Sequence, residues 1–118
     1  MLPSSHSQVY REFKLDLEEL KDTLSQDTVD RSHLKSSVAK LQDFFQNQIL
    51  TLDGNGLDPT LEHQVQSFQV EIDKQLKLLG MDGLFLQAAK QAATATQRIN
   101  QASDRLTLLL RYCDLLLR

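Results

Sequence analysis

The stretch TATQRINQASDRLTLLLRYCDLLLR, residues 94–118, decides the fold of this chain. Apolar side chains recur along it at alternating spacings of three and four, at Ile99, Ala102, Leu106, Leu109, Cys113 and Leu116. That spacing is typical of a helix packed lengthwise against other helices. Its second half carries leucines beyond what one buried stripe requires, namely Leu108, Leu110, Leu115 and Leu117. These extra leucines either fill the centre of a bundle or form an interface.

Composition indicates one ordinary globular domain, because 118 residues with 41% hydrophobic content suffice for a single core. The net charge of −3 gives no general attraction to nucleic acid or to an anionic membrane. The single cysteine, Cys113, has no internal disulfide partner, which favours a reducing, cytoplasmic setting. The N-terminus lacks a secretory signal pattern, and the apolar run at 106–117 is shorter than the roughly 20 residues of a membrane span.

Periodicity along the rest of the chain predicts an all-α fold with one domain, residues 1–118. We expect an antiparallel up-down-up-down four-helix bundle. The predicted main helices span residues 5–26, 30–52, 58–80 and 94–117, with a short extra helical segment at 83–91 before the last helix. The Asp53-Gly54-Asn55-Gly56 segment reads as a helix connection. It lacks the glutamate that a calcium loop needs at its twelfth position, which is Gln64.

Residues typical of helix ends set these boundaries. The Ser4-Ser5 pair, Asp30, and Asp58 followed by Pro59 read as starts of the first three helices. Glycines at 80 and 83 favour a break, because a helix continued to Ala89 would be about 48 Å long, against about 33–36 Å for the others. Asp82 would then cap the segment at 83–91. The alternative is one long helix that tolerates both glycines.

The last helix is predicted to open on a capping box formed by Thr94 and Gln97. In the first helix, apolar spacing places Tyr10 on the flank of the inward stripe. The opposite side carries an outward carboxylate row, Glu12, Asp16 and Glu19, which is typical of a solvated face.

Residues that carry catalytic or metal chemistry do not converge in this sequence. His6, His33 and His63 fall on three different predicted segments, and no Glu-x-x-His pair of the kind that binds di-iron is present. The periodicity places Cys113 in the core, where it reads as a small buried side chain. The sequence therefore predicts a protein that is not an enzyme and has no cofactor or metal.

The arginines of the last helix allow two interpretations. In the first, Arg98, Arg105, Arg111 and Arg118 pair across the bundle with the acidic first helix. In the second, arginines and Tyr112 rim an apolar docking surface, since Tyr and Arg are enriched in binding hot spots. On the second interpretation the predicted partner-binding residues are Arg98, Arg105, Leu108, Arg111, Tyr112 and Leu115.

Several segments resemble the PatD family of cyanobacterial heterocyst frequency control proteins. They are LFLQAAKQ at 84–91, Gln97-Arg98, Asp104-Arg105-Leu106 and Arg111-Tyr112-Cys113-Asp114. The resemblance extends over most of the chain, including Tyr10-Arg11-Glu12-Phe13, although Ala92-Ala93 stands where a proline is expected. It implies a cytoplasmic regulator of how often vegetative cells become heterocysts, with the division protein FtsZ as partner.

The function that we expect is therefore a non-enzymatic, regulatory protein–protein interaction module. The alternative is a structural bundle that uses its extra apolar face to form a homodimer, or an adaptor without a division partner. A nucleic-acid binder is disfavoured because acidic residues, Asp104 and Asp114, interrupt the arginines.

Overall fold

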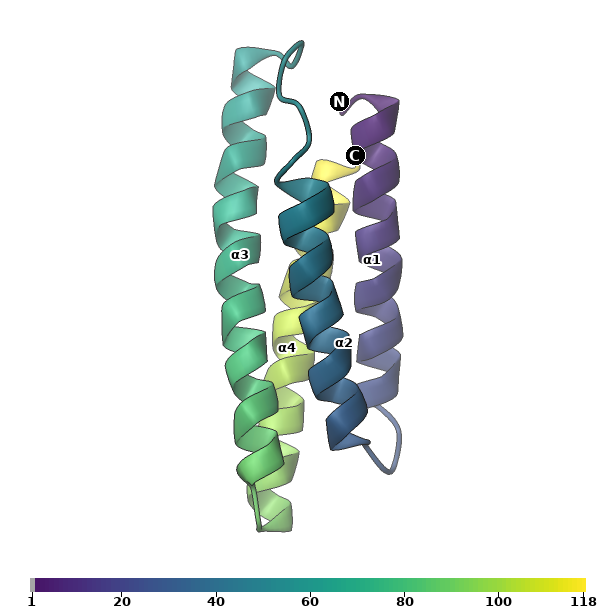
Figure 1. Cartoon of the computed structure of the whole chain (residues 1–118), viewed down its shortest axis with the longest axis vertical. Coiled ribbons are helices and arrows are strands. Elements are labelled where there is room, and N and C mark those ends of the chain that lie inside the picture. The colour runs from purple at the N-terminus through teal and green to yellow at the C-terminus, as the bar shows by residue number, and fades with distance from the viewer. Residues whose placement is uncertain (1) are drawn as a thin grey trace.

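Four long helices run antiparallel in the order of the sequence (Figure 1). In this computed structural model, which describes residues 2–118, they are α1 (Ser4–Leu24), α2 (Arg31–Phe44), α3 (Pro59–Ala88) and α4 (Ala92–Leu116). A π-helical turn, η1 (Phe45–Ile49), continues α2. Each helix packs on its neighbours in sequence, and α4 also packs on α1, which closes the ring. The predicted all-α, up-down-up-down bundle is confirmed.

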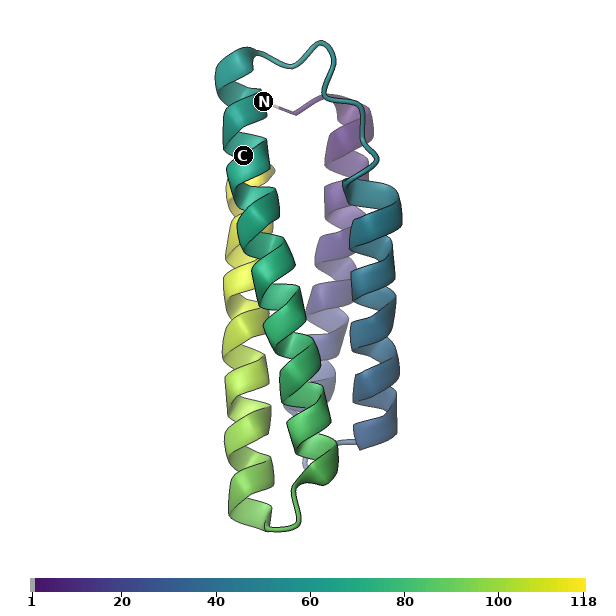
Figure 2. The same cartoon turned by 60° about the vertical axis from the view of Figure 1, so that its left-hand side comes forward.

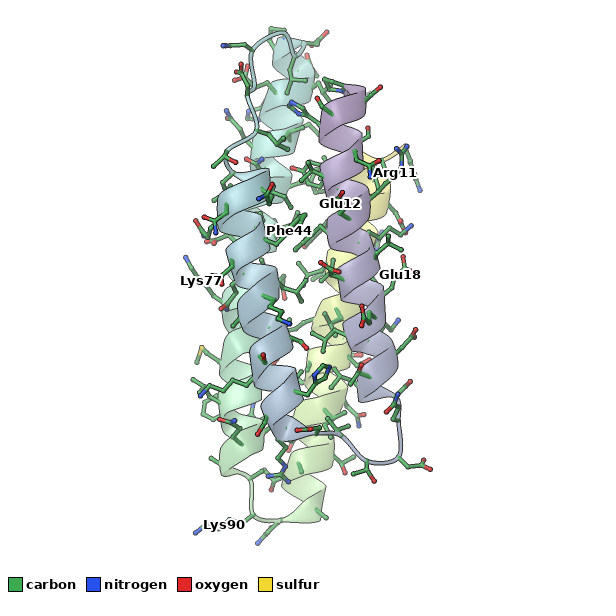
Figure 3. The ribbon with its side chains drawn as sticks, turned by 45° about the vertical axis from the view of Figure 1, so that its right-hand side comes forward. Arg11, Glu12, Glu18, Phe44, Lys77 and Lys90 are labelled. Atoms are coloured by element: carbon green, nitrogen blue, oxygen red, sulfur yellow. The ribbon has the colours of Figure 1, made fainter. Side chains whose placement is uncertain are left out.

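The core is a column of side chains from the inward stripe of every helix. Phe13 of α1 stacks on Phe44 with ring centroids 5.9 Å apart, and Phe45 lies 6.3 Å from the same ring. Figure 3 shows Phe44 between α2 and α1, while Arg11, Glu12 and Glu18 on α1 are exposed to solvent. The π-helical hydrogen bond from Leu50 N–H to the Phe45 carbonyl adds one residue to the turn. Both Phe45 and Ile49 are buried.

Tyr10 belongs to this core, so its predicted place on the flank of α1 is wrong. Its side chain is completely buried, whereas Val9 is only half-buried. The hydroxyl accepts a hydrogen bond of 3.3 Å from the Gln69 side-chain amide on α3. A buried phenol needs such a partner for its polar tip. The sequence of α1 alone cannot reveal this one, because Gln69 lies 59 residues away.

The predicted break at Gly80–Gly83 is wrong, and so is the separate segment at 83–91. α3 continues through both glycines to Ala88. An unbroken α3 is longer than α1 and α2. The bundle accommodates the extra length because α3 and α4 extend beyond the α1–α2 connection at its lower end (Figures 1 and 2). Asp82 is consequently an interior helix residue and not an N-cap. Burial of Leu79 and Leu86 on either side of the glycines offsets their poor helix propensity.

Gly80 also permits a close approach between α2 and α3. The Gln42 side-chain amide donates a 3.1 Å hydrogen bond to the Leu76 carbonyl on α3. A Cβ atom at Gly80 would lie only 2.9 Å from the Gln42 Nε2 atom. The glycine that reads as a helix stop is therefore a packing residue inside a helix.

Helix starts were predicted with mixed success. Asp30 accepts hydrogen bonds from the Ser32 and His33 amides, and Asp58 accepts one from Thr60, so both predicted caps are confirmed. At α1 the capping position is Pro3, with no side-chain cap, so Ser4 and Ser5 lie inside the helix.

The α3–α4 connection also differs from the prediction. α4 begins at Ala92 after Gln91, so the predicted Thr94–Gln97 capping box is wrong. α3 ends at Ala88 because Ala89 adopts an extended conformation. The guanidinium of Arg31, at the start of α2, donates hydrogen bonds of 2.8 Å to the Leu86 and Ala89 carbonyls. These bonds add partners to carbonyls at the end of α3, where the Leu86 carbonyl also accepts a hydrogen bond from the Ala89 amide.

A glycine substitution tests the continuity of α3. A Cβ at Gly83 would meet no atom within 4 Å, so Gly83→Ala should raise the free energy of unfolding by about 0.5–1 kcal/mol through helix propensity. In Gly80→Ala the same gain is offset by the displaced Gln42 amide, and we expect little net change. Urea unfolding followed by circular dichroism measures both. A clearly destabilised Gly83→Ala variant would contradict the unbroken helix.

Candidate functional site

A buried ion pair joins α3 to α4 and determines where the candidate site residues lie. Asp82 is 2% exposed, and its carboxylate accepts a 2.6 Å hydrogen bond from Arg105 Nε. Arg98, two turns earlier on α4, places a guanidinium nitrogen 3.8 Å from the other carboxylate oxygen. The Arg98 guanidinium also lies 4.5 Å from the centroid of the Phe85 ring, within cation–π range.

The predicted pairing of these arginines with the acidic first helix is therefore wrong. Arg98 and Arg105 pair with α3, while Arg111 and Arg118 are exposed and form no ion pair with residues 2–118. The pair that does connect α1 with α4 has the opposite polarity, with Lys14 on α1 and Asp114 on α4, 2.7 Å apart. The sequence could not reveal the true partner, since the predicted break treated Asp82 as a helix cap.

Removing one member of the buried Asp82–Arg105 pair should lower the free energy of unfolding substantially, whereas removing both members should change it little. Arg105→Met leaves the Asp82 carboxylate buried with only the distant Arg98, so we expect a loss of about 2–3 kcal/mol in unfolding free energy. The double variant Asp82→Leu/Arg105→Met should lie within about 1 kcal/mol of the native protein. Urea unfolding measures this cycle.

The exposed Lys14–Asp114 pair provides the matched control. Lys14→Ala should change stability much less than Arg105→Met, because solvent screens an exposed ion pair. Equal losses in the two single variants would contradict a special structural role for Asp82.

Tyr112 is the predicted site residue that the structure places beside a pocket. Its ring lies 5.7 Å from the ring of Phe68 on α3, in a tilted arrangement. Both rings line a shallow pocket of about 490 Å³, which is completed by residues of the first turns of α3, Thr60, His63, Gln64, Ser67 and Glu71. Burial raises the pKa of the Tyr112 hydroxyl, nearby Glu71 raises it further, and Arg111 opposes the rise. At neutral pH the hydroxyl is protonated and can donate a hydrogen bond.

Leu108 and Leu115 share a side of α4 with Tyr112, because they precede and follow it by four and three residues. Both are half-buried, and neither packs against the core cluster of residues 2–118. Leu110 and Leu117, in contrast, do pack against that cluster. The four extra leucines thus divide into two that widen the core and two that lie outside it. We call Phe68, Leu108, Tyr112 and Leu115 the α3–α4 face.

The six predicted site residues fall into two groups. Arg98 and Arg105 are engaged by Asp82, with side chains 32% and 19% exposed. Leu108, Tyr112 and Leu115 contribute to the α3–α4 face, and the exposed side chain of Arg111 is near enough to Tyr112 to affect its pKa. The structure therefore separates a structural ion pair from an apolar face.

Sequence analysis missed the most exposed apolar cluster on α3. Met81, Leu84 and Phe85 are 49%, 57% and 45% exposed, near the end where α3 extends beyond α2. Met81 and Leu84 also line a groove between α2 and α3 with Gly80 and Gly83. The spacing of three and four among these residues was a detectable signal. The predicted break places Leu84 and Phe85 on the separate segment at 83–91 and leaves Met81 outside it.

Cys113 is buried as predicted, and burial raises the pKa of its thiol from 9.0 to about 12. Neighbouring Asp114 contributes to the rise, and Lys14 opposes it. A thiol with this pKa carries almost no thiolate at neutral pH, and the thiolate is the nucleophilic form. Cys113 therefore serves as a packing residue in this state.

The raised pKa predicts a loss of stability in alkaline solution. The folded protein holds the Cys113 proton up to about pH 12, while the unfolded chain releases it near pH 9.0. The stabilisation is fully present below pH 9 and is lost as the pH rises toward 12, by at most about 1.4 kcal/mol per pH unit. Urea unfolding between pH 8 and about 11 measures the slope. Cys113→Ala should flatten it; an unchanged slope in that variant would contradict the assignment.

Other candidate chemistry is dispersed. His6 is buried at the start of α1, His33 contacts Ser37 Oγ at 3.4 Å on α2, and His63 lines the Phe68–Tyr112 pocket. Within residues 2–118 no three His, Cys, Asp or Glu side chains are grouped as metal ligands would be. The Asp53 carboxylate accepts a hydrogen bond from the Asn55 amide in a turn, as expected of a connection.

No helix in the described part of the chain combines the length and the hydropathy needed to cross a bilayer. Comparisons of the sequence with known protein families and with curated proteins, and of the fold with solved structures, found no match for this chain.

Proposed function

We propose that this protein is a non-enzymatic interaction module that binds a partner protein through its α3–α4 face. The observation that carries the proposal is the pair of leucines, Leu108 and Leu115, which flank Tyr112 without joining the core. Three apolar side chains at spacings of four and three match the anchors through which helices recognise one another. The pocket beside Tyr112 adds a recess into which a partner side chain can insert.

The resemblance to the PatD family makes the division protein FtsZ the first partner to test. On this proposal the protein acts in the cytoplasm of a cyanobacterium and limits heterocyst frequency by docking on FtsZ. The bundle supports such a role as a rod of 51 × 21 × 20 Å, whose long side offers room for a partner helix.

The structure changes which variants are informative. Arg105→Ala would leave the buried Asp82 carboxylate without its close partner, so lost binding could reflect unfolding. Tyr112→Ala and Leu115→Gln alter the face directly, and both residues are half-exposed. Leu15→Ala is the matched control, because Leu15 is an apolar residue on α1 that is 64% exposed.

We expect Tyr112→Ala and Leu115→Gln each to weaken binding of purified FtsZ at least tenfold, or about 1.4 kcal/mol, while Leu15→Ala leaves it unchanged. Biolayer interferometry measures the affinities, and circular dichroism verifies folding. Full FtsZ binding by both folded variants would exclude the α3–α4 face.

Light scattering separates the homodimer alternative from partner binding. If the native protein is a dimer at micromolar concentration and the same two substitutions make it monomeric, the face joins two copies of this chain. A monomeric native protein that loses FtsZ binding on substitution supports the proposal.

A further inference from the structure

A second pocket lies at the end of the bundle where α1 and α3 begin. Figure 2 shows the α2–α3 connection arching across this upper end, from the end of η1 to the start of α3. The pocket has a volume of about 220 Å³. Apolar cavities of about 150 Å³ hold a benzene molecule, so this volume suffices for a ligand of several heavy atoms.

Polar side chains from two helices converge on this end pocket. They are His6 and Tyr10 from α1 and Glu62, Gln66 and Gln69 from α3. Leucines of the α2–α3 connection, including Leu52 and Leu57, supply its apolar part. Such a mixture of apolar walls with a few convergent polar groups is characteristic of small-molecule sites.

His6 is the observation that points to a ligand. It is 8% exposed and lines the pocket, and no hydrogen bond joins its ring nitrogens to residues 2–118. No buried side-chain nitrogen or oxygen of these residues lacks a partner, so a His6 nitrogen without one is open to the pocket and free to bond a molecule that enters it. The neighbouring Tyr10 hydroxyl, by contrast, has one in Gln69.

Glu62 determines the charge that the pocket accepts. Its carboxylate forms no ion pair with the described residues, and neither lysine nor arginine lines the pocket. The residue lies in the first turn of α3, near the positive end of the helix dipole. Gly54 of the connection passes close by, since a Cβ there would lie 3.6 Å from Glu62 Oε1. The carboxylate is therefore held against the pocket wall with its charge unbalanced.

We propose that the end pocket binds a small organic cation, a guanidinium or alkylammonium compound, with Glu62 as its counter-ion. A guanidinium offers five N–H donors. The acceptors that line the pocket are the Glu62 carboxylate, the side-chain carbonyls of Gln66 and Gln69, and the lone pair of a His6 ring nitrogen. This site is separate from the α3–α4 face and does not depend on the proposed partner.

Two isosteric probes test the proposal on the full chain. Ethylguanidine and ethylurea have the same number of heavy atoms, but only the first is cationic at neutral pH. In NMR titrations, ethylguanidine should shift the His6 ring and the backbone amides around the pocket, and ethylurea should bind at least tenfold more weakly. A difference of that size corresponds to about 1.4 kcal/mol.

Glu62→Gln keeps the shape of the side chain and removes its charge. It should weaken ethylguanidine binding at least tenfold, because a charge-assisted hydrogen bond becomes a weaker, neutral one. Glu18→Gln is the matched control and should leave binding unchanged, because Glu18 is exposed on α1 and does not line the end pocket. Shifts that are absent up to about 50 mM ethylguanidine, equal binding of ethylurea, or unchanged binding in folded Glu62→Gln would each overturn the proposal.

Discussion

The buried carboxylate of Asp82 is the constraint on which the arrangement of α3 and α4 depends. A charged group inside a helical interface is tolerated only when a partner of opposite charge meets it there. Arg105 does so at 2.6 Å, and this happens in one register of the two helices. A shift of α4 by one helical turn would leave the buried Asp82 carboxylate without this close partner. The pair therefore favours the register in which Arg105 lies opposite Asp82.

The candidate face follows from that register. With Arg105 fixed on Asp82, Tyr112 comes to lie on Phe68 two turns further along α4. The same rotation of the helix directs Leu110 and Leu117 toward the core, while Leu108 and Leu115 remain outside it. The Asp82–Arg105 pair that stabilises the bundle therefore also fixes which leucines of α4 lie outside the core.

The first turns of α3 separate two surfaces of different chemistry. On the side toward α4, Phe68 and Tyr112 form an open apolar recess suited to a protein partner. On the side toward α1 and the α2–α3 connection, His6 and Glu62 line a partly open pocket of mixed polar and apolar character, suited to a small ligand. The two proposals can fail independently, since different side chains carry them.

The sequence by itself determined the helical class, the number of long helices, two of the helix caps and the burial of Cys113. These features depend on local periodicity and on side chains that bond to their own helix ends. The continuity of α3, the burial of Tyr10 and the partners of the arginines were decided only by the tertiary structure. Each depends on a residue far along the chain: Gln42 beside Gly80, Gln69 on Tyr10 and Asp82 on Arg105. Local patterns contain no information about such contacts, so a glycine that permits close packing looks the same as a glycine that ends a helix.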